Sequence, residues 1–517
     1  MAFVTGLAPP RSVGKTAVTR TRRWKNVVVA IERQGGHAAA DPEAVAYSDS
    51  IEYPSPEGPF CELGHLSEVP HLTDYLPDLE VHKNPAAGRE FINRYFVDNG
   101  DAVMKQVVMN AAKPRDMTMY MRAGPRESVY FHPDEVRAAI VSCGGICPGI
   151  NTVIREVVEN LWYEYGVRSI FGVQNGYRGF YSKNWKTMNP EMVDQIHKQG
   201  GTILGSSRGG FDCRKIMDAL ETRGINHVYI IGGDGTIRGA NILAAEAKKR
   251  CLKLSVVSVP KTIDNDIPVI DRSFGFETAV EGALRAINAA CVEAQSFPNG
   301  LGLVKLMGRN SGFIAMHATL SSRDVDVCLI PEVPFQMDGP CGLNAYVEKR
   351  LKERGRCIVV VAEGAGQNIV VDKRAVVRDR SGNRLLSDIG LYLYNELKLY
   401  FQQKETEINL KYIDPTYMIR AVPANAADNL YCTMLAHMAV HGAFAGFTAF
   451  TVGPVNGFHT YIPLADVTNL QNKVNIVDRN WLRLVASTGQ SEMMDTSLSG
   501  SDCNGTEPEA EPDFLTA

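Results

Sequence analysis

Residues 228–266 constrain the fold most strongly, because two apolar runs in this stretch each lead into a polar loop. The first run, 228–231, is typical of a buried strand and ends in a glycine-rich loop at 232–236. Glycines let successive backbone N–H groups turn toward an anion, and the carboxylate of Asp234 can hold Mg²⁺ directly or through water. The loop therefore predicts a phosphate-binding site.

The second apolar run, 254–259, leads into a loop with oxygen-bearing side chains at alternate positions. In an extended loop, this alternation places Thr262, Asp264 and Asp266 on one side. One carboxylate can then accept a proton from a substrate hydroxyl while the other supports the metal shell. Together the two loops predict a phosphoryl-transfer centre in which a phosphate cradle faces a general base.

The composition argues against several other classes of protein. At 517 residues the chain exceeds one core of ordinary size, so we expect two globular domains with extensions. The net charge of -4 gives no electrostatic basis for nucleic-acid binding, and no apolar run has the length of a membrane span. The 11 cysteines have no Cys-x-x-Cys or zinc-like spacing, which indicates reduced thiols in an intracellular compartment.

Further strand–turn–helix patterns predict an α/β fold. The apolar run at 138–141 leads into a glycine-rich turn and then into a helical pattern from 152 to 163, and together they form a phosphate-binding unit. Strand–turn patterns recur at 169–179 and 200–208. Such alternation of strands and helices implies a mostly parallel sheet that is covered on both faces.

Two later strands end in polar loops that can bind a phosphorylated substrate. One strand ends just before Arg309 and the other just before Glu363. Ligands of open α/β sheets collect at the carboxyl ends of the strands, so we expect Arg309 to bind a phosphate and Glu363 a hydroxyl. Tyr417 and Arg420 supply another phenol and another guanidinium.

Taken together, these loops resemble those of the phosphofructokinases, and the resemblance runs from residue 136 to 486. Lys261, the long N-terminal part and the run 411–417 are most similar to the plant ATP-dependent branch of that family. The resemblance implies two Rossmann-like α/β lobes with mostly parallel sheets, an active-site cleft between them and an N-terminal extension. It also implies that ATP, with Mg²⁺, phosphorylates fructose 6-phosphate on its 1-hydroxyl in glycolysis.

The resemblance further implies roles for individual residues. Asp264 is expected to be the general base, with Thr262, Asp266 and Arg309 as further catalytic residues, and Asp234 is expected to hold Mg²⁺. The residues expected to bind ATP are Gly145, Tyr177, Arg208, Gly209, Gly233, Asp234, Gly235 and Thr236. The residues expected to surround the sugar phosphate are Thr262, Ile263, Asp264, Met307, Gly308, Arg309, Glu363, Tyr417 and Arg420.

Two positions bear on the identity of the phosphoryl donor. The pyrophosphate-dependent branch of the family has an Asp where this chain has Gly235, and a carboxylate there would occupy the position of the α-phosphate and repel it. Lys261 is a contrary sign, because that branch also has Lys at this position. We weigh Gly235 more heavily since its effect is steric and local. ATP is therefore the expected donor, and a pyrophosphate-dependent enzyme is the alternative.

Two further alternatives are compatible with part of the pattern. NAD kinases and diacylglycerol kinases share the loop at 232–236, but the loops at 260–266 and 307–309 argue against them. A non-catalytic regulatory subunit of the same fold should have lost the base or the metal ligand, whereas this chain keeps both Asp264 and Asp234.

The chain divides into six expected parts. They are a transit-like or disordered segment at 1–66, an accessory N-terminal layer with few clear elements at 67–135, an ATP-binding lobe at 136–275, a sugar-phosphate-binding lobe at 276–419, C-terminal segments returning to both lobes at 420–486, and a disordered acidic tail at 487–517. The basic N-terminus has no acidic residue before Glu32, which predicts import into the chloroplast stroma, with the cytoplasm as the alternative. The resemblance implies an allosteric homo-oligomer, a tetramer.

Overall fold

The computed structural model describes residues 64–88, 96–108, 117–182, 185–370, 385–468 and 471–490. Every element described below belongs to the unit Pro59–Ala517. Nearly all of the expected transit-like segment and most of the expected acidic tail lie outside the described residues.

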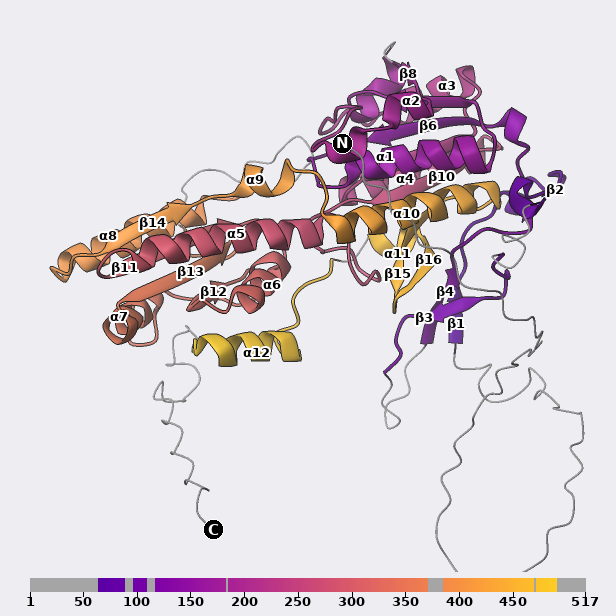
Figure 1. Ribbon diagram of the computed structural model, residues 1–517. Helices are drawn as coiled ribbons and strands as arrows, with labels where there is room; N and C mark the ends of the chain where they lie inside the picture. The colour runs from indigo at the N-terminus through magenta and orange to yellow at the C-terminus, as the bar shows by residue number, and fades with distance from the viewer. Residues whose placement is uncertain are drawn as a thin grey trace, which may run out of the picture. The chain divides into compact units, whose positions relative to one another are not determined.

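A ten-stranded sheet forms the first lobe (Figure 1). Its central strands pair in parallel, in the order β10 (Ser255–Pro260), β9 (His227–Gly232), β6 (Arg137–Ser142) and β7 (Ser169–Val173). β9 and β10 are buried along their whole length. Continuous apolar runs of this kind are expected where helices cover both faces of a parallel sheet.

Helices pack on both faces of this sheet. On one face α1 (Ile150–Glu159) packs against α10 (Ala426–Phe444), and on the other α3 (Cys213–Thr222) packs beside α4 (Asp234–Lys249). Alternate side chains of a strand point to opposite faces. The sheet therefore separates two hydrophobic cores, one under each pair of helices.

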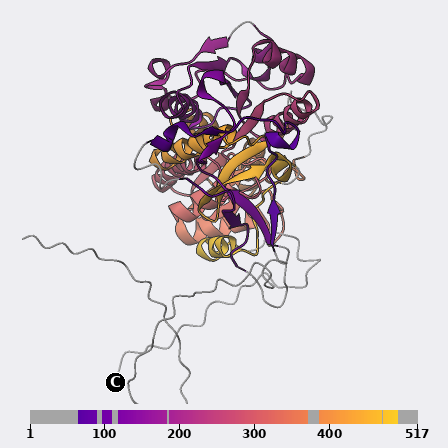
Figure 2. The same cartoon turned by 90° about the vertical axis from the view of Figure 1, so that its right-hand side faces the viewer.

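The C-terminal part of the chain completes the same sheet. β15 (Phe450–Val455) pairs in parallel with β10, and β16 (Phe458–Pro463) turns back antiparallel to β15. β16 in turn pairs with β4 (Met117–Arg122), so that strands from the early and late parts of the chain lie side by side (Figure 2). The later helix α12 (Arg479–Thr488) packs on α6 (Phe313–Ser322), which belongs to the second lobe described next.

The second lobe contains a four-stranded parallel sheet. Its strands follow the order β12 (Val327–Leu329), β13 (Arg356–Ala362), β11 (Gly300–Leu306) and β14 (Asn409–Ile413). Helices α5 and α6 pack on one face and α7 and α8 on the other, with bounds Phe276–Gln295, Phe313–Ser322, Leu343–Arg354 and Ile389–Gln403. The prediction of an α/β fold with mostly parallel sheets is confirmed.

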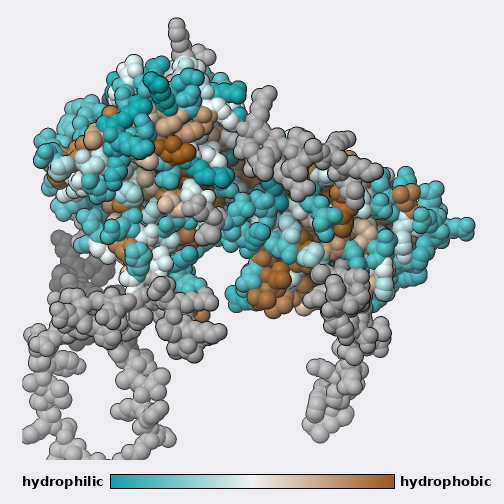
Figure 3. All heavy atoms as spheres, turned by 180° about the vertical axis from the view of Figure 1, so that it is seen from behind, coloured by the Kyte–Doolittle hydropathy of each residue, from teal (hydrophilic) through white to brown (hydrophobic). Residues whose placement is uncertain are grey.

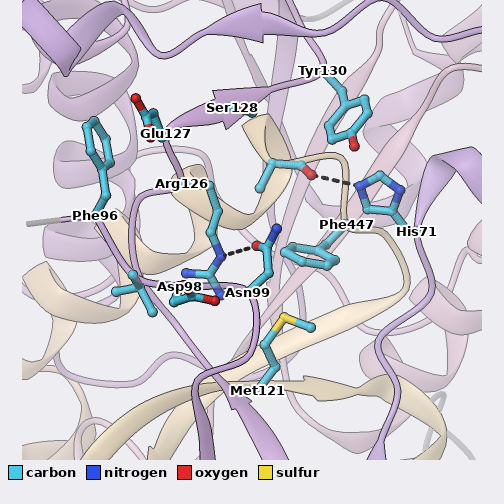
Figure 4. A pocket seen from close by; sticks show the side chains of 12 residues that line it. His71, Phe96, Asp98, Asn99, Met121, Arg126, Glu127, Ser128, Tyr130 and Phe447 are labelled. Atoms are coloured by element: carbon cyan, nitrogen blue, oxygen red, sulfur yellow. Dashed lines mark hydrogen bonds between the residues drawn. The ribbon is translucent and has the colours of Figure 1, made fainter. Parts of the chain in front are cut away.

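The described part before β6 adds strands to the first lobe. β1 (Gly64–Ser67) pairs in parallel with β4, and β3 (Ala102–Met104) pairs antiparallel with it. β1 and β3 are short, and β4, with which both pair, is itself paired with β16 from a distant part of the sequence. This explains why the sequence pattern shows few clear elements here. A cavity of ≈ 630 Å³ lies between this part and the end of α10 (Figure 4), where His71 Nε2 is 2.8 Å from the carbonyl oxygen of Ala445. None of the predicted site residues is among its described lining residues.

The surface is mainly hydrophilic on the face shown in Figure 3, where hydrophobic residues form separate patches. None of the helices in the described ranges combines the length and apolar content of a membrane-spanning segment. Single exposed hydrophobic side chains such as Met418, 77% exposed on α9 (Thr416–Arg420), are common on protein surfaces.

The N-terminus of α5 is capped by a residue from a distant helix. Oδ2 of Asp428, on α10, accepts hydrogen bonds from the backbone N (2.7 Å) and from Oγ1 (2.6 Å) of Thr278. The N-cap residue Gly275 makes no side-chain hydrogen bond itself, and Asp428 is buried. The contact joins the first lobe to the first helix of the second lobe, at the helix end where the dipole favours a negative charge.

We expect Asp428→Ala to lower the free energy of unfolding by about 1–3 kcal/mol, because two donors of Thr278 lose their buried acceptor. The shift in the urea midpoint, followed by circular dichroism, measures this change. Asp218→Ala is the matched control, since its half-exposed carboxylate shares Arg250 with Glu221, and we expect less than about 1 kcal/mol for it. Equal shifts in the two variants would contradict the capping role.

Candidate functional site

Loops from both lobes meet at a cavity of ≈ 480 Å³. The predicted site residues that line it are Gly145, Tyr177, Arg208, Gly209, Gly233, Asp234, Gly235, Thr236, Lys261, Thr262, Asp264, Asp266, Met307, Arg309 and Glu363. The predicted residues that are not among its lining residues are Ile263, Gly308, Tyr417 and Arg420. The fold thus brings together residues from loops that are widely separated in the sequence.

The N-terminus of α4 opens into this cavity. The helix begins at Asp234, directly after the N-cap residue Gly233. The first N–H groups of a helix have no intrahelical partner, and the helix dipole adds partial positive charge at this end. A Cβ atom on Gly235 would meet no atom within 4 Å, so this part of the wall is open. The arrangement suits a phosphate group.

Two buried polar side chains support the walls of the cavity. Tyr177 donates its hydroxyl to the carbonyl oxygen of Thr236 at 2.7 Å. Lys261, which is 7% exposed, donates from Nζ to the carbonyl oxygen of Gly145 at 2.7 Å. Burial lowers the pKa of Lys261. Both side chains therefore fix the glycine-rich loops through backbone carbonyl groups.

The acidic loop after β10 is bent, so the assumption of an extended loop is wrong. Asn265 has a φ of 55°, in the left-handed region, and its Oδ1 accepts a hydrogen bond from Ser273 N at 2.8 Å. Thr262, Asp264 and Asp266 nevertheless all line the cavity. Thr262 Oγ1 accepts a hydrogen bond from Asp264 N at 3.1 Å and donates one to Asp266 Oδ1 at 3.0 Å.

Burial and mutual repulsion perturb the carboxylates of the site. Burial, followed by the charges of Asp266 and Glu363, raises the pKa of Asp264, although a backbone hydrogen bond from Arg309 opposes this shift. Oδ1 of Asp264 is buried and has no hydrogen-bond partner in the part of the chain that the structure describes. Burial and then the charge of Asp234 raise the pKa of Asp266. A proton or a cation relieves repulsion of this kind.

The ends of β11 and β13 form the wall contributed by the second lobe. They are joined where Glu363 N donates a hydrogen bond to the carbonyl oxygen of Leu306 at 2.9 Å. Burial raises the pKa of the Glu363 side chain, and the positive charge of Arg309 opposes this shift. The wall therefore presents a cation and a carboxylate to the cavity.

The four remaining predicted residues have different surroundings. Ile263 is a buried core residue, and Gly308 has a φ of 130°, which favours glycine. Tyr417 is 73% exposed, and Arg420 Cζ lies 5.0 Å from the centre of its ring. Arg420 Nε is buried without a hydrogen-bond partner among the described residues, and its charge lowers the pKa of Glu363. Ile263 and Gly308 shape the loops, whereas Arg420 is close to the second-lobe wall.

The cavity also contains residues that the sequence analysis missed, namely Cys143, Gly144, Ser207, Phe211, Arg238, Asn310 and Gln471. A hydrogen bond from the Gln471 side chain opposes the rise that burial causes in the pKa of Asp234. Gln471 belongs to no recognisable motif, so the sequence contains no signal for it. Arg238 lies one helical turn after Asp234 on α4, and this spacing could have indicated it.

Comparison with known proteins identifies relatives over most of the chain. Residues 137–443 match the family model described as phosphofructokinase. The chain is 57% identical over 433 residues to ATP-dependent 6-phosphofructokinase 7 of Arabidopsis thaliana, covering 83% of this chain and 89% of that protein. It is 55% identical over 435 residues to the chloroplastic ATP-dependent 6-phosphofructokinase 4 of the same plant, covering 83% and 82%.

A bacterial relative and a solved structure extend this comparison. The chain is 46% identical over 407 residues to the ATP-dependent 6-phosphofructokinase of Borreliella burgdorferi, covering 77% of this chain and 91% of that protein. The solved pyrophosphate-dependent phosphofructokinase from Marinobacter aquaeolei covers 67% of this chain and 88% of its own, with a TM-score of 0.56 at 20% identity. This structural likeness shows a shared fold.

Gly364 and Gly235 provide a matched pair for testing the packing of the site. A Cβ atom on Gly364 would lie 1.9 Å from the carbonyl oxygen of Arg309, whereas one on Gly235 would meet nothing within 4 Å. We expect Gly364→Ala to lower the free energy of unfolding by about 1–3 kcal/mol. Gly235→Ala should change it by less than about 1 kcal/mol. Thermal unfolding measures both, and an unchanged midpoint for Gly364→Ala would contradict the close approach.

Proposed function

Because this chain belongs to the phosphofructokinase family, we propose that it transfers a phosphoryl group from ATP to the 1-hydroxyl of fructose 6-phosphate, giving fructose 1,6-bisphosphate and ADP. Relatives named ATP-dependent 6-phosphofructokinase support this activity. The observation that carries the proposal is that Asp264, whose buried Oδ1 has no partner among the described residues, shares a cavity with the N-terminus of α4. The transfer requires both a proton acceptor and an anion-binding group.

Asp264 is the proposed general base. Its pKa is raised by burial and by neighbouring carboxylates, which makes it a better proton acceptor than an ordinary aspartate when ionised. Its backbone is fixed by Ser311 Oγ, which donates to the Asp264 carbonyl oxygen at 3.0 Å. In this role Oδ1 accepts the proton of the sugar 1-hydroxyl as the hydroxyl oxygen bonds to phosphorus. Thr262 is proposed to orient the phosphoryl group that is transferred.

Mg²⁺ is the proposed metal, with Asp234 as its ligand and Asp266 beside it. Asp234 and Asp266 both line the cavity, and the charge of Asp234 contributes to the raised pKa of Asp266, so a divalent cation would relieve their repulsion. At sites that bind nucleotide phosphates, Mg²⁺ is held by one or two carboxylates together with the substrate phosphates. When bound, the ion would neutralise charge on the phosphates.

The proposed ATP site combines the α4 N-terminus with Arg208, Gly209 and Gly145. Glycine at position 235 supports ATP as donor, because a Cβ there would meet no atom within 4 Å and the space remains open to a nucleotide. Lys261 is the contrary sign, since the pyrophosphate-dependent branch also has Lys. Its Nζ is engaged by the Gly145 carbonyl oxygen at 2.7 Å, which assigns it a supporting role compatible with either donor.

The proposed site for fructose 6-phosphate lies on the second-lobe wall, with Met307, Arg309 and Glu363. Arg309 would bind the phosphoryl group or the sugar phosphate, and Glu363 would accept a hydrogen bond from a sugar hydroxyl. Arg420 adds a nearby guanidinium whose Nε has no hydrogen-bond partner among the described residues. Tyr417 is proposed as a substrate contact from its family position, although it is 73% exposed.

We propose that the protein forms an allosteric homo-oligomer, a tetramer, as its family implies.

The chloroplast stroma is the proposed location, with the cytoplasm as the alternative. The basic N-terminus supports import, and two relatives from Arabidopsis thaliana are named chloroplastic. Other relatives from that plant have names without this word, which keeps the alternative in place.

We expect Asp264→Asn to lower turnover by roughly 10²- to 10⁴-fold, because the amide cannot accept the hydroxyl proton. Steady-state kinetics with saturating substrates measures this loss, and thermal unfolding checks that the variant folds. Asp218→Asn is the control, since its carboxylate is half-exposed and paired with Arg250 at 2.9 Å. Near-normal turnover in the folded Asp264→Asn protein would remove Asp264 from the role of base.

The proposed function itself is tested by turnover of fructose 6-phosphate with Mg²⁺, comparing ATP with pyrophosphate. We expect activity with ATP alone, and we expect Gly235→Asp to abolish it because a carboxylate would fill the open space beside the α4 N-terminus. Gly235→Ala adds volume without charge, so comparing it with Gly235→Asp distinguishes the effect of volume on ATP use from that of charge. Activity of the parent protein with pyrophosphate alone would reverse the choice of donor, and inactivity with both would favour a regulatory subunit.

A further inference from the structure

Lys305 lies on β11, four residues before Arg309, and is not among the lining residues of the cavity. Its side chain is 12% exposed, and Nζ lies 2.7 Å from Oδ2 of Asp414. It also lies 3.3 Å from both carboxylate oxygens of Asp388. One ammonium group therefore joins the strand that leads into the loop at 307–309 to two acidic residues from later parts of the second lobe.

Asp414 connects this ammonium group to α9. Its Oδ1 accepts hydrogen bonds from the backbone N of Thr416 at 3.1 Å and from Thr416 Oγ1 at 2.5 Å, so its carboxylate is bound to the first residue of the helix. The same helix ends with Arg420. The Lys305–Asp414 ion pair therefore links the strand that precedes Arg309 to the start of the helix that ends with Arg420.

Asp388 connects the same ammonium group to α8. Its Oδ1 accepts a hydrogen bond from Leu391 N at 3.1 Å and forms the N-cap of that helix. The charge of Lys305 also acts on Glu363, where it opposes the rise that burial causes in the pKa of that carboxyl group. Lys305 thus contacts two carboxylates that bind the first turns of α8 and α9, and it acts electrostatically on a residue of the cavity wall.

We propose that Lys305 is a positioning residue for the sugar-phosphate side of the site, holding α9 and its Arg420 in register with the loop that carries Arg309. The inference rests on the proposed function, because it assigns the second-lobe wall to fructose 6-phosphate. A side chain paired with two carboxylates at low exposure holds a more defined geometry than a fully solvated ion pair, since burial weakens solvent screening. Substrate affinity depends on this register because two guanidinium groups from different elements must meet one ligand.

The test compares Lys305→Met with Lys305→Arg in the full-length chain. Met keeps the length of the side chain but removes its charge, so we expect the KM for fructose 6-phosphate to rise roughly 10- to 100-fold. The KM for ATP and kcat should stay within about 2-fold, because Lys305 is not among the lining residues of the cavity into which the α4 N-terminus opens. Arg keeps the charge and should restore most of the affinity.

A control variant and a variant of the partner carboxylate test the role of the Lys305–Asp414 ion pair. Lys352→Met removes the same charge from a side chain that is 74% exposed on α7 and paired with Glu348 at 2.7 Å, and it should leave both KM values unchanged. Asp414→Asn should raise the KM for fructose 6-phosphate as Lys305→Met does. The double variant should be no worse than the more severe single variant, because both remove one interaction.

The outcomes separate this inference from the proposed function. If the parent protein does not phosphorylate fructose 6-phosphate, the proposed function fails and the inference fails with it. If the parent is active and Lys305→Met leaves the KM for fructose 6-phosphate unchanged, only the inference is overturned. It is also overturned if the KM values of both substrates rise together or if Lys305→Arg gives no rescue, since a general loss of structure would explain those results.

Discussion

The site is built around three carboxyl side chains, those of Asp234, Asp264 and Asp266, which line one cavity. Removing carboxylates from water and placing them together disfavours their ionised forms, and the pKa of all three is raised accordingly. The α4 N-terminus and the positive charge of Arg309 offset part of this cost. Because the offset is incomplete, the cavity favours a cation or a proton, as a phosphoryl-transfer site requires.

A C-terminal segment joins the two lobes at this cavity. Asn472 N donates a hydrogen bond to the carbonyl oxygen of Asp266 at 2.8 Å, and Val474 N donates one to Glu332 Oε1 at 2.8 Å. The same carboxylate oxygen accepts a hydrogen bond from Gly312 N at 3.1 Å, at the start of α6. A few consecutive residues thus contact the acidic loop of the first lobe and a helix of the second. Any change in the spacing of the lobes would therefore act on the backbone of the acidic loop.

Local sequence patterns are sufficient to predict the strands that carry the site. They are insufficient to predict the contacts that hold its loops in place. β6, β9, β10, β11 and β13 each coincide with an apolar run that ends in a polar loop, and parallel pairing within each of the two sheets brings the loops of that sheet to one edge. The left-handed turn at Asn265 depends instead on Ser273, and the hydrogen bond between Gln471 and Asp234 joins segments far apart in the chain. Contacts of this kind leave no periodic signal, so only the folded chain reveals them.

Gly235 and Lys261 bear on the phosphoryl donor in different ways. Lys261 is 7% exposed and its Nζ is bound to the Gly145 carbonyl oxygen, so it supports a glycine loop and its side chain adds little to the open surface of the cavity. A supporting lysine is compatible with ATP and with pyrophosphate, because both donors need the loop in place. Gly235 lines the cavity, and a Cβ atom there would meet no atom within 4 Å, so a side chain at this position would add volume, and in the case of Asp charge, to open space in the cavity. We therefore expect discrimination between the donors to depend on the space at the α4 N-terminus more than on the buried lysine.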